Sequence, residues 1–127
     1  MNKTALLIED NEQNRYLATF LLEQNDYTVV AAPDGPCGIK IARTLVPGII
    51  LLDIQLPGMD GYAVARALRE IEALEQTPII AVTSYAMVGD REKSLAAGCN
   101  GYIEKPINPE TFVEEIESFG APAQGIP

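Results

Sequence analysis

Short apolar runs recur at regular intervals along the chain and alternate with segments of helical periodicity. Each run is brief and often β-branched, which is typical of strands buried on both faces of a parallel sheet. The five runs occupy residues 5–8, 27–32, 49–52, 79–82 and, more weakly, 101–103. The pattern therefore predicts five central strands.

The segments between these runs repeat apolar residues every three or four positions, as amphipathic helices do. Four apolar faces stand out: Leu17, Phe20 and Leu21; Ile39, Ala42 and Val46; Val64, Ala67, Leu68 and Ile71; and Phe112, Val113, Ile116 and Phe119. Asp60 and Asn108 are predicted N-caps, and Pro109 suits a first helical position. The least periodic helix is expected within residues 88–97.

The start of the second helix is the weakest part of this pattern. Residues 35–38 read Gly-Pro-Cys-Gly. Proline is tolerated only in the first turn of a helix, and glycine weakens a helix. We therefore expect this helix to start late or to be mobile.

Five strands alternating with five helices predict an α/β fold, a doubly wound five-stranded parallel sheet with right-handed crossovers. The pattern covers residues 1–119, which we interpret as one domain. Residues 120–127 are uncharged and rich in Gly, Pro and Ala, so they are expected to form a flexible tail or the stub of a linker.

Charge and composition narrow the possible functions. The chain has 127 residues, with 18 acidic and 9 basic side chains and a formal charge of −9, which disfavours direct binding to nucleic acid or to anionic membranes. Histidine is absent, which excludes Ser/His/Asp and Cys/His nucleophile systems. Cys37 and Cys99 are far apart and are expected to be buried apolar residues. The first apolar run is too short for a signal peptide or a membrane span, and we expect a cytoplasmic protein.

Polar residues follow the apolar runs at the points where the strands should end. They are Glu9 and Asp10 after the first run, Asp53 after the third, Thr83 after the fourth, and Glu104, Lys105 and Pro106 after the fifth. In an open α/β sheet, ligands bind at the carboxyl ends of the strands, beside the point where the strand order reverses. With the order 2-1-3-4-5, three carboxylates would converge on one pocket with a hydroxyl and an ammonium at its rim.

Three carboxylates in one crevice repel each other unless a cation lies among them. Oxygen ligands in a small cluster favour Mg2+. With Lys105 and one divalent cation the predicted pocket is neutral, so it could accept a phosphoryl group. Taken singly, each residue has a simpler interpretation: Asp10 or Asn11 as a helix cap, Thr83 as a strand former and Lys105 as a solvated charge. Their common position at one sheet edge favours the functional interpretation.

Four motifs resemble, in their order and spacing, the receiver domain of two-component response regulators. They are ALLIEDN, LLDIQLPGMDG, IIAVTSYA and GYIEKP. The resemblance covers residues 4 to about 119 and implies the flavodoxin-like (βα)5 fold of chemotaxis regulators. It implies a phosphorylation-dependent switch with at most autocatalysed phosphorylation and dephosphorylation, and not a metabolic enzyme. The phosphoryl donor would be a phosphohistidine on a sensor histidine kinase or a histidine phosphotransfer protein.

The resemblance also implies a role for each matching residue. Asp53 would be the phosphoacceptor, and Glu9, Asp10, Asp53 and the backbone carbonyl of Gln55 would hold Mg2+, with Mn2+ as a possible substitute. Lys105 would pair with a phosphoryl oxygen, Thr83 would move to bond another, and Tyr102 would be the switch aromatic. The Lys105–Pro106 bond would be cis.

The resemblance further implies that the output face comprises the fourth helix, the fifth strand and the fifth helix. Four glutamates give it an acidic flank, at positions Glu110, Glu114, Glu115 and Glu117. We therefore expect a downstream partner with a basic docking surface. Two departures from the family pattern are Glu9, where an aspartate is common, and Ser84, where alanine is frequent. We also hypothesise that the ring of Tyr85 limits water access and lengthens the phosphoryl lifetime.

Other functions remain open at this point. A haloacid-dehalogenase-like phosphohydrolase needs a second aspartate two positions after the nucleophile, and here that position is Gln55. A flavodoxin-like flavin carrier would bind phosphate after the first strand, where residues 9–12 are mostly acidic. A degenerate receiver used only as a binding module is a third possibility. The chain could also be a complete regulator or a receiver excised from a hybrid histidine kinase.

Overall fold

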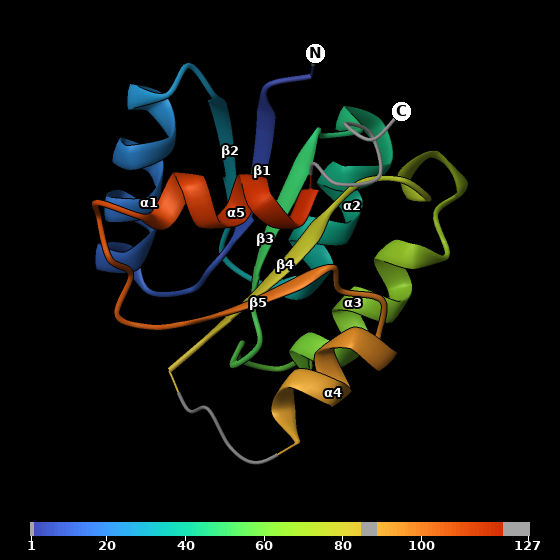
Figure 1. The fold of residues 1–127 in the computed structure, drawn as a ribbon. Coiled ribbons are helices and arrows are strands. Elements are labelled where there is room, and N and C mark those ends of the chain that lie inside the picture. Colours follow the sequence, from blue (N-terminus) through green and yellow to red (C-terminus); the bar gives the residue numbers. More distant parts are fainter. Residues whose placement is uncertain (1, 85–88, 121–127) are drawn as a thin grey trace, which may run out of the picture.

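The computed structural model describes residues 2–84 and 89–120. Its five strands form one parallel sheet in the order β2-β1-β3-β4-β5, as the sequence predicted (Figure 1). The strands are β1 (Thr4–Ile8), β2 (Thr28–Ala32), β3 (Ile49–Asp53), β4 (Ile79–Thr83) and β5 (Gly101–Glu104). The helices are α1 (Glu12–Gln24), α2 (Gly35–Leu45), α3 (Gly61–Arg69), α4 (Asp90–Ala96) and α5 (Phe112–Gly120), with a 3-10 turn η1 (Glu72–Leu74).

The helices cover both faces of the sheet, with α1 and α5 on one face and α2, α3 and α4 on the other (Figure 1). Successive residues of β1 therefore enter different cores. Leu6 and Ile8 pack towards α2 and α3, whereas Ala5 and Leu7 pack towards α1 and α5. This double burial explains why the strands appear in the sequence as continuous apolar runs instead of alternating ones. None of the described helices is long and apolar enough to cross a membrane.

The prediction of a late start for α2 is wrong, because the helix begins at Gly35. The side chain of Asp34 caps it by accepting a hydrogen bond from the Cys37 backbone N–H at 2.9 Å. Pro36 lies in the first turn, where its missing N–H is not needed. A Cβ on Gly38 would approach Ile8 Cγ1 to 2.7 Å, so this glycine allows α2 to pack closely on β1.

The other helix boundaries follow the sequence more closely. The predicted cap Asp60 accepts a hydrogen bond from the Tyr62 N–H at 3.0 Å. Asn108 instead begins a turn, accepting from the Glu110 N–H, and α5 starts at Phe112, so Pro109 precedes the helix. The fourth helix begins at Asp90, and residue 88 lies outside the described part of the chain.

Gly61 is a second position where only glycine fits. A Cβ there would lie 2.6 Å from the Ile54 carbonyl oxygen, and the Gly61 N–H donates to that oxygen at 3.2 Å. We expect Gly61→Ala to lower the free energy of unfolding by about 1–3 kcal/mol, because backbone atoms must move to admit the methyl group. Urea denaturation would measure this loss. An unchanged midpoint would show that residues 54–61 shift without cost.

Candidate functional site

Three carboxylates meet at the carboxyl edge of the sheet. Glu9 and Asp10 directly follow β1, and Asp53 ends the neighbouring strand β3. One oxygen of each side chain lies within 4.8 Å of an oxygen of the others. Glu9 and Asp53 are each only 4% exposed, whereas Asp10 is exposed to solvent. The register of β1 and β3 therefore brings together the acidic residues that the sequence placed at one edge.

Lys105 reaches into this cluster from the loop after β5. Its Nζ lies 2.7 Å from Glu9 Oε1 and 3.4 Å from Asp53 Oδ2, and its side chain is 9% exposed. The sequence predicted an ammonium at the rim of the pocket, but the structure buries it between two carboxylates. A buried charge of this kind needs its partners, because removing one leaves the others uncompensated.

Burial raises the pKa of the Glu9 carboxyl above its usual value. The Lys105 ammonium opposes this rise, and the negative charge of Asp53 adds to it. The cluster thus carries more negative charge than its one ammonium can balance. A divalent cation would remove that excess, and oxygen ligands around a partly exposed Asp10 suit Mg2+.

Asp53 is oriented by the two groups that contact its carboxylate. Its Oδ1 accepts a hydrogen bond from the Gln55 N–H at 2.9 Å, while Oδ2 faces Lys105. The side chain of Gln55 crosses to the next strand, where its Oε1 accepts from the Ser84 N–H at 3.1 Å. The resemblance implied a role for Gln55 only through its backbone carbonyl, so this link between the loops after β3 and β4 was missed.

Thr83 and Tyr102 flank the cluster on β4 and β5. Thr83 is 2% exposed and its carbonyl accepts the Lys105 N–H at 2.7 Å, so the two residues share one edge. The Tyr102 hydroxyl is buried without a hydrogen-bond partner among the described residues, and burial raises its pKa. The Lys105–Pro106 peptide bond is cis. Tyr85 lies outside the described residues.

A second residue missed by the sequence reasoning is Arg15 on α1. Its Nη1 donates to the backbone carbonyls of Glu9 at 2.9 Å and Asp10 at 3.1 Å. Asn11 caps the same helix by accepting from the Asn14 N–H, which is the simpler role that the sequence left open for it. An arginine one turn after an acidic pair at a strand end was the signal available for this anchor.

The parallel sheet and its edge of acidic residues define the class of protein. Residues 5–117 match the response regulator receiver domain family, and the chain belongs to that family. Receiver domains are signalling switches of two-component systems that interact with histidine kinases and downstream targets.

The chain is similar to several named relatives over most of its length. It is 40% identical over 119 residues to the polar-differentiation response regulator DivK of Brucella ovis, covering 94% of this chain and 97% of the relative. Among solved structures, the receiver domain of the sensor histidine kinase PA1611 from Pseudomonas aeruginosa is 33% identical, with a TM-score of 0.86 over 96% of this chain and 100% of that one. That structure has a magnesium ion in its active-site cleft. The chemotaxis regulator CheY4 of Vibrio cholerae is 25% identical, with a TM-score of 0.88 over 94% and 99%.

Proposed function

We propose that this chain is a phosphorylation-dependent switch in a two-component system or phosphorelay, with Asp53 as its phosphoacceptor. The observation that carries the proposal is the cluster of Glu9, Asp10 and Asp53 around the buried Lys105 ammonium. Asp53 is the member that both the Gln55 N–H and Lys105 orient. Glu9, Asp10, Asp53 and the Gln55 carbonyl would hold Mg2+, with Mn2+ as a substitute of similar oxygen preference.

In the proposed transfer, a carboxylate oxygen of Asp53 attacks the phosphorus of a donor phosphohistidine. The phosphorus–nitrogen bond breaks, the imidazole leaves with its electron pair and takes a proton from solvent, and Asp53 becomes an acyl phosphate. The donor is a sensor histidine kinase or a histidine phosphotransfer protein, since this chain has no histidine. A bound Mg2+ supplies charge neutralisation at the phosphoryl oxygens.

Lys105 and Thr83 carry the response to the new charge in this proposal. The ammonium that now pairs with Glu9 and Asp53 would turn to a phosphoryl oxygen, and the Thr83 hydroxyl would bond another. Tyr102 would then follow Thr83 and bias the face formed by α4, β5 and α5. The chain would catalyse at most its own phosphorylation and dephosphorylation.

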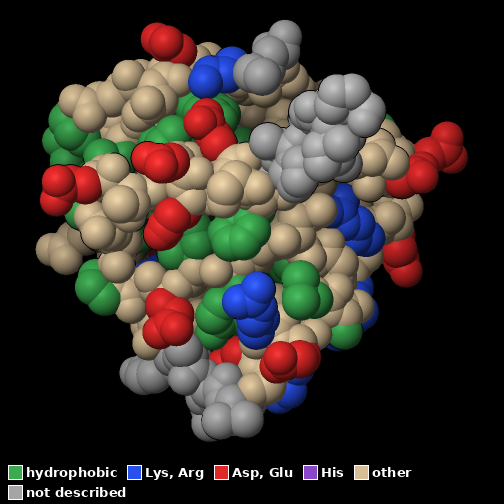
Figure 2. Space-filling view, in the orientation of Figure 1, with side chains coloured by type: hydrophobic (Ala, Val, Ile, Leu, Met, Phe, Trp, Pro, Cys, Tyr) green, Lys and Arg blue, Asp and Glu red, His purple; other side chains and the backbone are tan. Residues whose placement is uncertain are grey.

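The output face offers a site for a downstream protein. Leu95 on α4 is 48% exposed, and acidic side chains gather over α5 (Figure 2). The first turn of α5 carries Glu114 and Glu115. A partner with a basic docking surface and an apolar centre would complement this face.

The extent of the domain is also part of the proposal. We place the receiver at residues 1–119 and a tail or linker stub at 120–127, in a cytoplasmic protein. The relatives provide a precedent for each arrangement: DivK is matched over 97% of its length, and the structure from PA1611 is the receiver domain of a sensor histidine kinase. The intact cluster of Asp53, Lys105 and Thr83 disfavours a degenerate receiver that only binds.

Incubation with phosphoramidate tests the chemistry. We expect intact mass spectrometry to show one added phosphoryl group when Mg2+ is present and none when EDTA replaces it, because the repelling carboxylates cannot admit more charge without the cation. Hydroxylamine should remove the group, as it does from an acyl phosphate. An adduct that forms equally in EDTA, or one that resists hydroxylamine, would contradict the proposal.

A further inference from the structure

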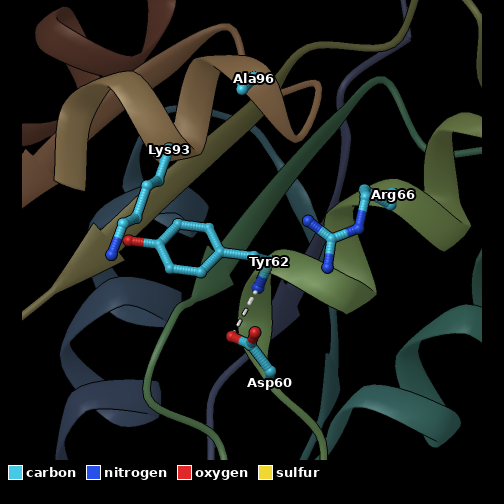
Figure 3. Close-up of a pocket in the computed structure, with 5 residues that line it drawn as sticks. All are labelled: Asp60, Tyr62, Arg66, Lys93 and Ala96. Carbon is cyan, nitrogen blue, oxygen red and sulfur yellow. Dashed lines mark hydrogen bonds between the residues drawn. The ribbon is translucent and has the colours of Figure 1, made fainter. Parts of the chain in front are cut away.

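A hollow of about 450 Å³ opens between α3 and α4, and none of its lining residues belongs to the carboxylate cluster. Asp60, Tyr62 and Arg66 line it from the α3 side, and Lys93 and Ala96 line it from α4 (Figure 3). The Tyr62 side chain extends from α3 towards α4, with Lys93 on one side and Arg66 on the other in this view. The hollow therefore presents an aromatic ring between two cations.

Arg66 and Lys93 differ from the other unpaired surface cations of the described ranges, such as Lys40 and Arg43, because they line the same hollow. Arg66 and Lys93 are exposed, and neither forms an ion pair or a hydrogen bond with a described residue. Arg69, on the same helix, is instead used internally, donating to the carbonyls of Gly98 and Leu74 and to the Asn100 side chain. Arg66 and Lys93 are thus available to a ligand that brings its own negative charge.

We propose that the hollow is a docking site for an acidic segment of a partner protein. Two carboxylates of the segment would pair with Arg66 and Lys93, and the chain between them would pack on the Tyr62 ring. The guanidinium of Arg66 offers the forked geometry that matches a carboxylate. This surface would recognise the opposite charge from the output face, whose flank is acidic.

An acidic peptide fits the hollow better than a compact polyphosphate does. The Asp60 carboxylate lines the same hollow and would repel a dense anion. A peptide can hold its carboxylates apart and direct a backbone N–H to Asp60. The hollow is also open to solvent, whereas sites for small molecules usually enclose most of the ligand.

Tyr62 connects the hollow to α4. Its hydroxyl lies 3.1 Å from Asp90 Oδ1 at the first residue of that helix, which places the ring in its position in the unmodified chain. Near α4, the Tyr102 hydroxyl on β5 is buried without a hydrogen-bond partner among the described residues. An unpaired buried hydroxyl costs free energy, so this part of the fold would gain from an arrangement that pairs it. The proposed function already has phosphorylation change the face that contains α4; resting on it, we infer that phosphorylation weakens docking in the hollow.

Titration with a blocked peptide of six glutamates tests the docking site. In amide chemical-shift spectra at fixed ionic strength, we expect saturable changes centred on α3 and α4 and none with a matched six-glutamine peptide. The double variant R66Q/K93Q should weaken binding about tenfold, since two charge pairs are lost. The control K40Q/R43Q removes the same charge from α2 and should change the affinity less than twofold, a threshold that separates local pairing from net charge.

Three results would overturn the docking site. They are chemical-shift changes located elsewhere, equal weakening by the control variant, and saturation by pyrophosphate but not by the peptide.

The coupling is tested separately by repeating the titration after phosphoramidate and Mg2+. We expect at least a threefold weaker affinity for the phosphorylated chain. If intact mass confirms the adduct and the affinity stays unchanged, the coupling is wrong and the proposed phosphorylation still holds; if no adduct forms, the proposed function itself fails.

Discussion

The Asp53→Asn variant is expected to form no phosphoryl adduct with phosphoramidate and Mg2+, a complete loss relative to the unmodified chain. An amide is a poor nucleophile and cannot give a stable acyl phosphate, so the chemistry stops even though the shape of the side chain is preserved. The Gln55 N–H can still donate to the remaining carbonyl oxygen, so the loop should keep its position. Intact mass spectrometry measures the adduct.

The matched control for this loss is Asp60→Asn. Asp60 is exposed, lies in the loop that follows Asp53, and caps α3 without joining the carboxylate cluster. Asparagine is an equally good N-cap, so this variant should fold and be phosphorylated as the unmodified chain is. If an adduct persists in Asp53→Asn and maps to Asp10, then Asp10 is the phosphoacceptor and the assignment to Asp53 is wrong.

Stability separates the two possible reasons for a lost adduct. Asp53→Asn removes one of three repelling carboxylates, so its free energy of unfolding in EDTA should be unchanged or higher. Thermal unfolding followed by circular dichroism would show this. A large loss of stability would mean that the missing adduct reports a damaged fold instead of a missing nucleophile.

The sheet could be predicted from the sequence because its strands are buried on both faces. Double burial produces continuous apolar runs, and these located each strand to within one residue of its observed ends. The largest systematic difference is at the carboxyl ends, where β3 and β4 continue through Asp53 and Thr83. Those residues are polar, so they interrupt the apolar run, yet their backbones still pair in the sheet.

The contacts that complete the site could not be predicted, because they join residues far apart in the chain. The Gln55 side chain reaches Ser84, and Lys105, which follows β5, reaches Glu9, which follows a strand three places away in the sheet. The pattern of apolar and polar residues within a segment does not predict such long-range side-chain contacts. The prediction for the start of α2 was wrong for a related reason. In the local sequence Gly38 looks like a helix breaker, but glycine is needed there because Ile8 of β1 packs closely against it.

Replacing Lys105 with methionine is expected to have the second largest effect, on stability as well as on phosphorylation. Methionine keeps the length of the side chain but leaves Glu9 and Asp53 buried without their ammonium. Breaking a buried pair in this way costs about 3–5 kcal/mol. In EDTA at neutral pH we expect urea denaturation to show a loss of this size. Lys40→Met on the exposed face of α2 is the matched control and should cost less than about 0.5 kcal/mol.

The pH dependence of that loss identifies its cause. The pKa of Glu9 in the folded chain is already raised by burial, and Lys105 is the group that lowers it, so the variant should raise it further. A carboxyl whose pKa is higher in the folded than in the unfolded chain makes its full contribution to the free energy of unfolding below its ordinary pKa of 4.5. That contribution is lost as the pH rises through the pKa of the folded chain. The deficit of Lys105→Met should therefore be small near pH 4 and grow towards neutral pH. Mg2+ should reduce it at pH 7 by binding only the folded chain. The loss of unfolding free energy could instead stay constant with pH and be unaffected by Mg2+. That result would mean that Lys105 contributes only packing and does not stabilise the fold by pairing with the carboxylates.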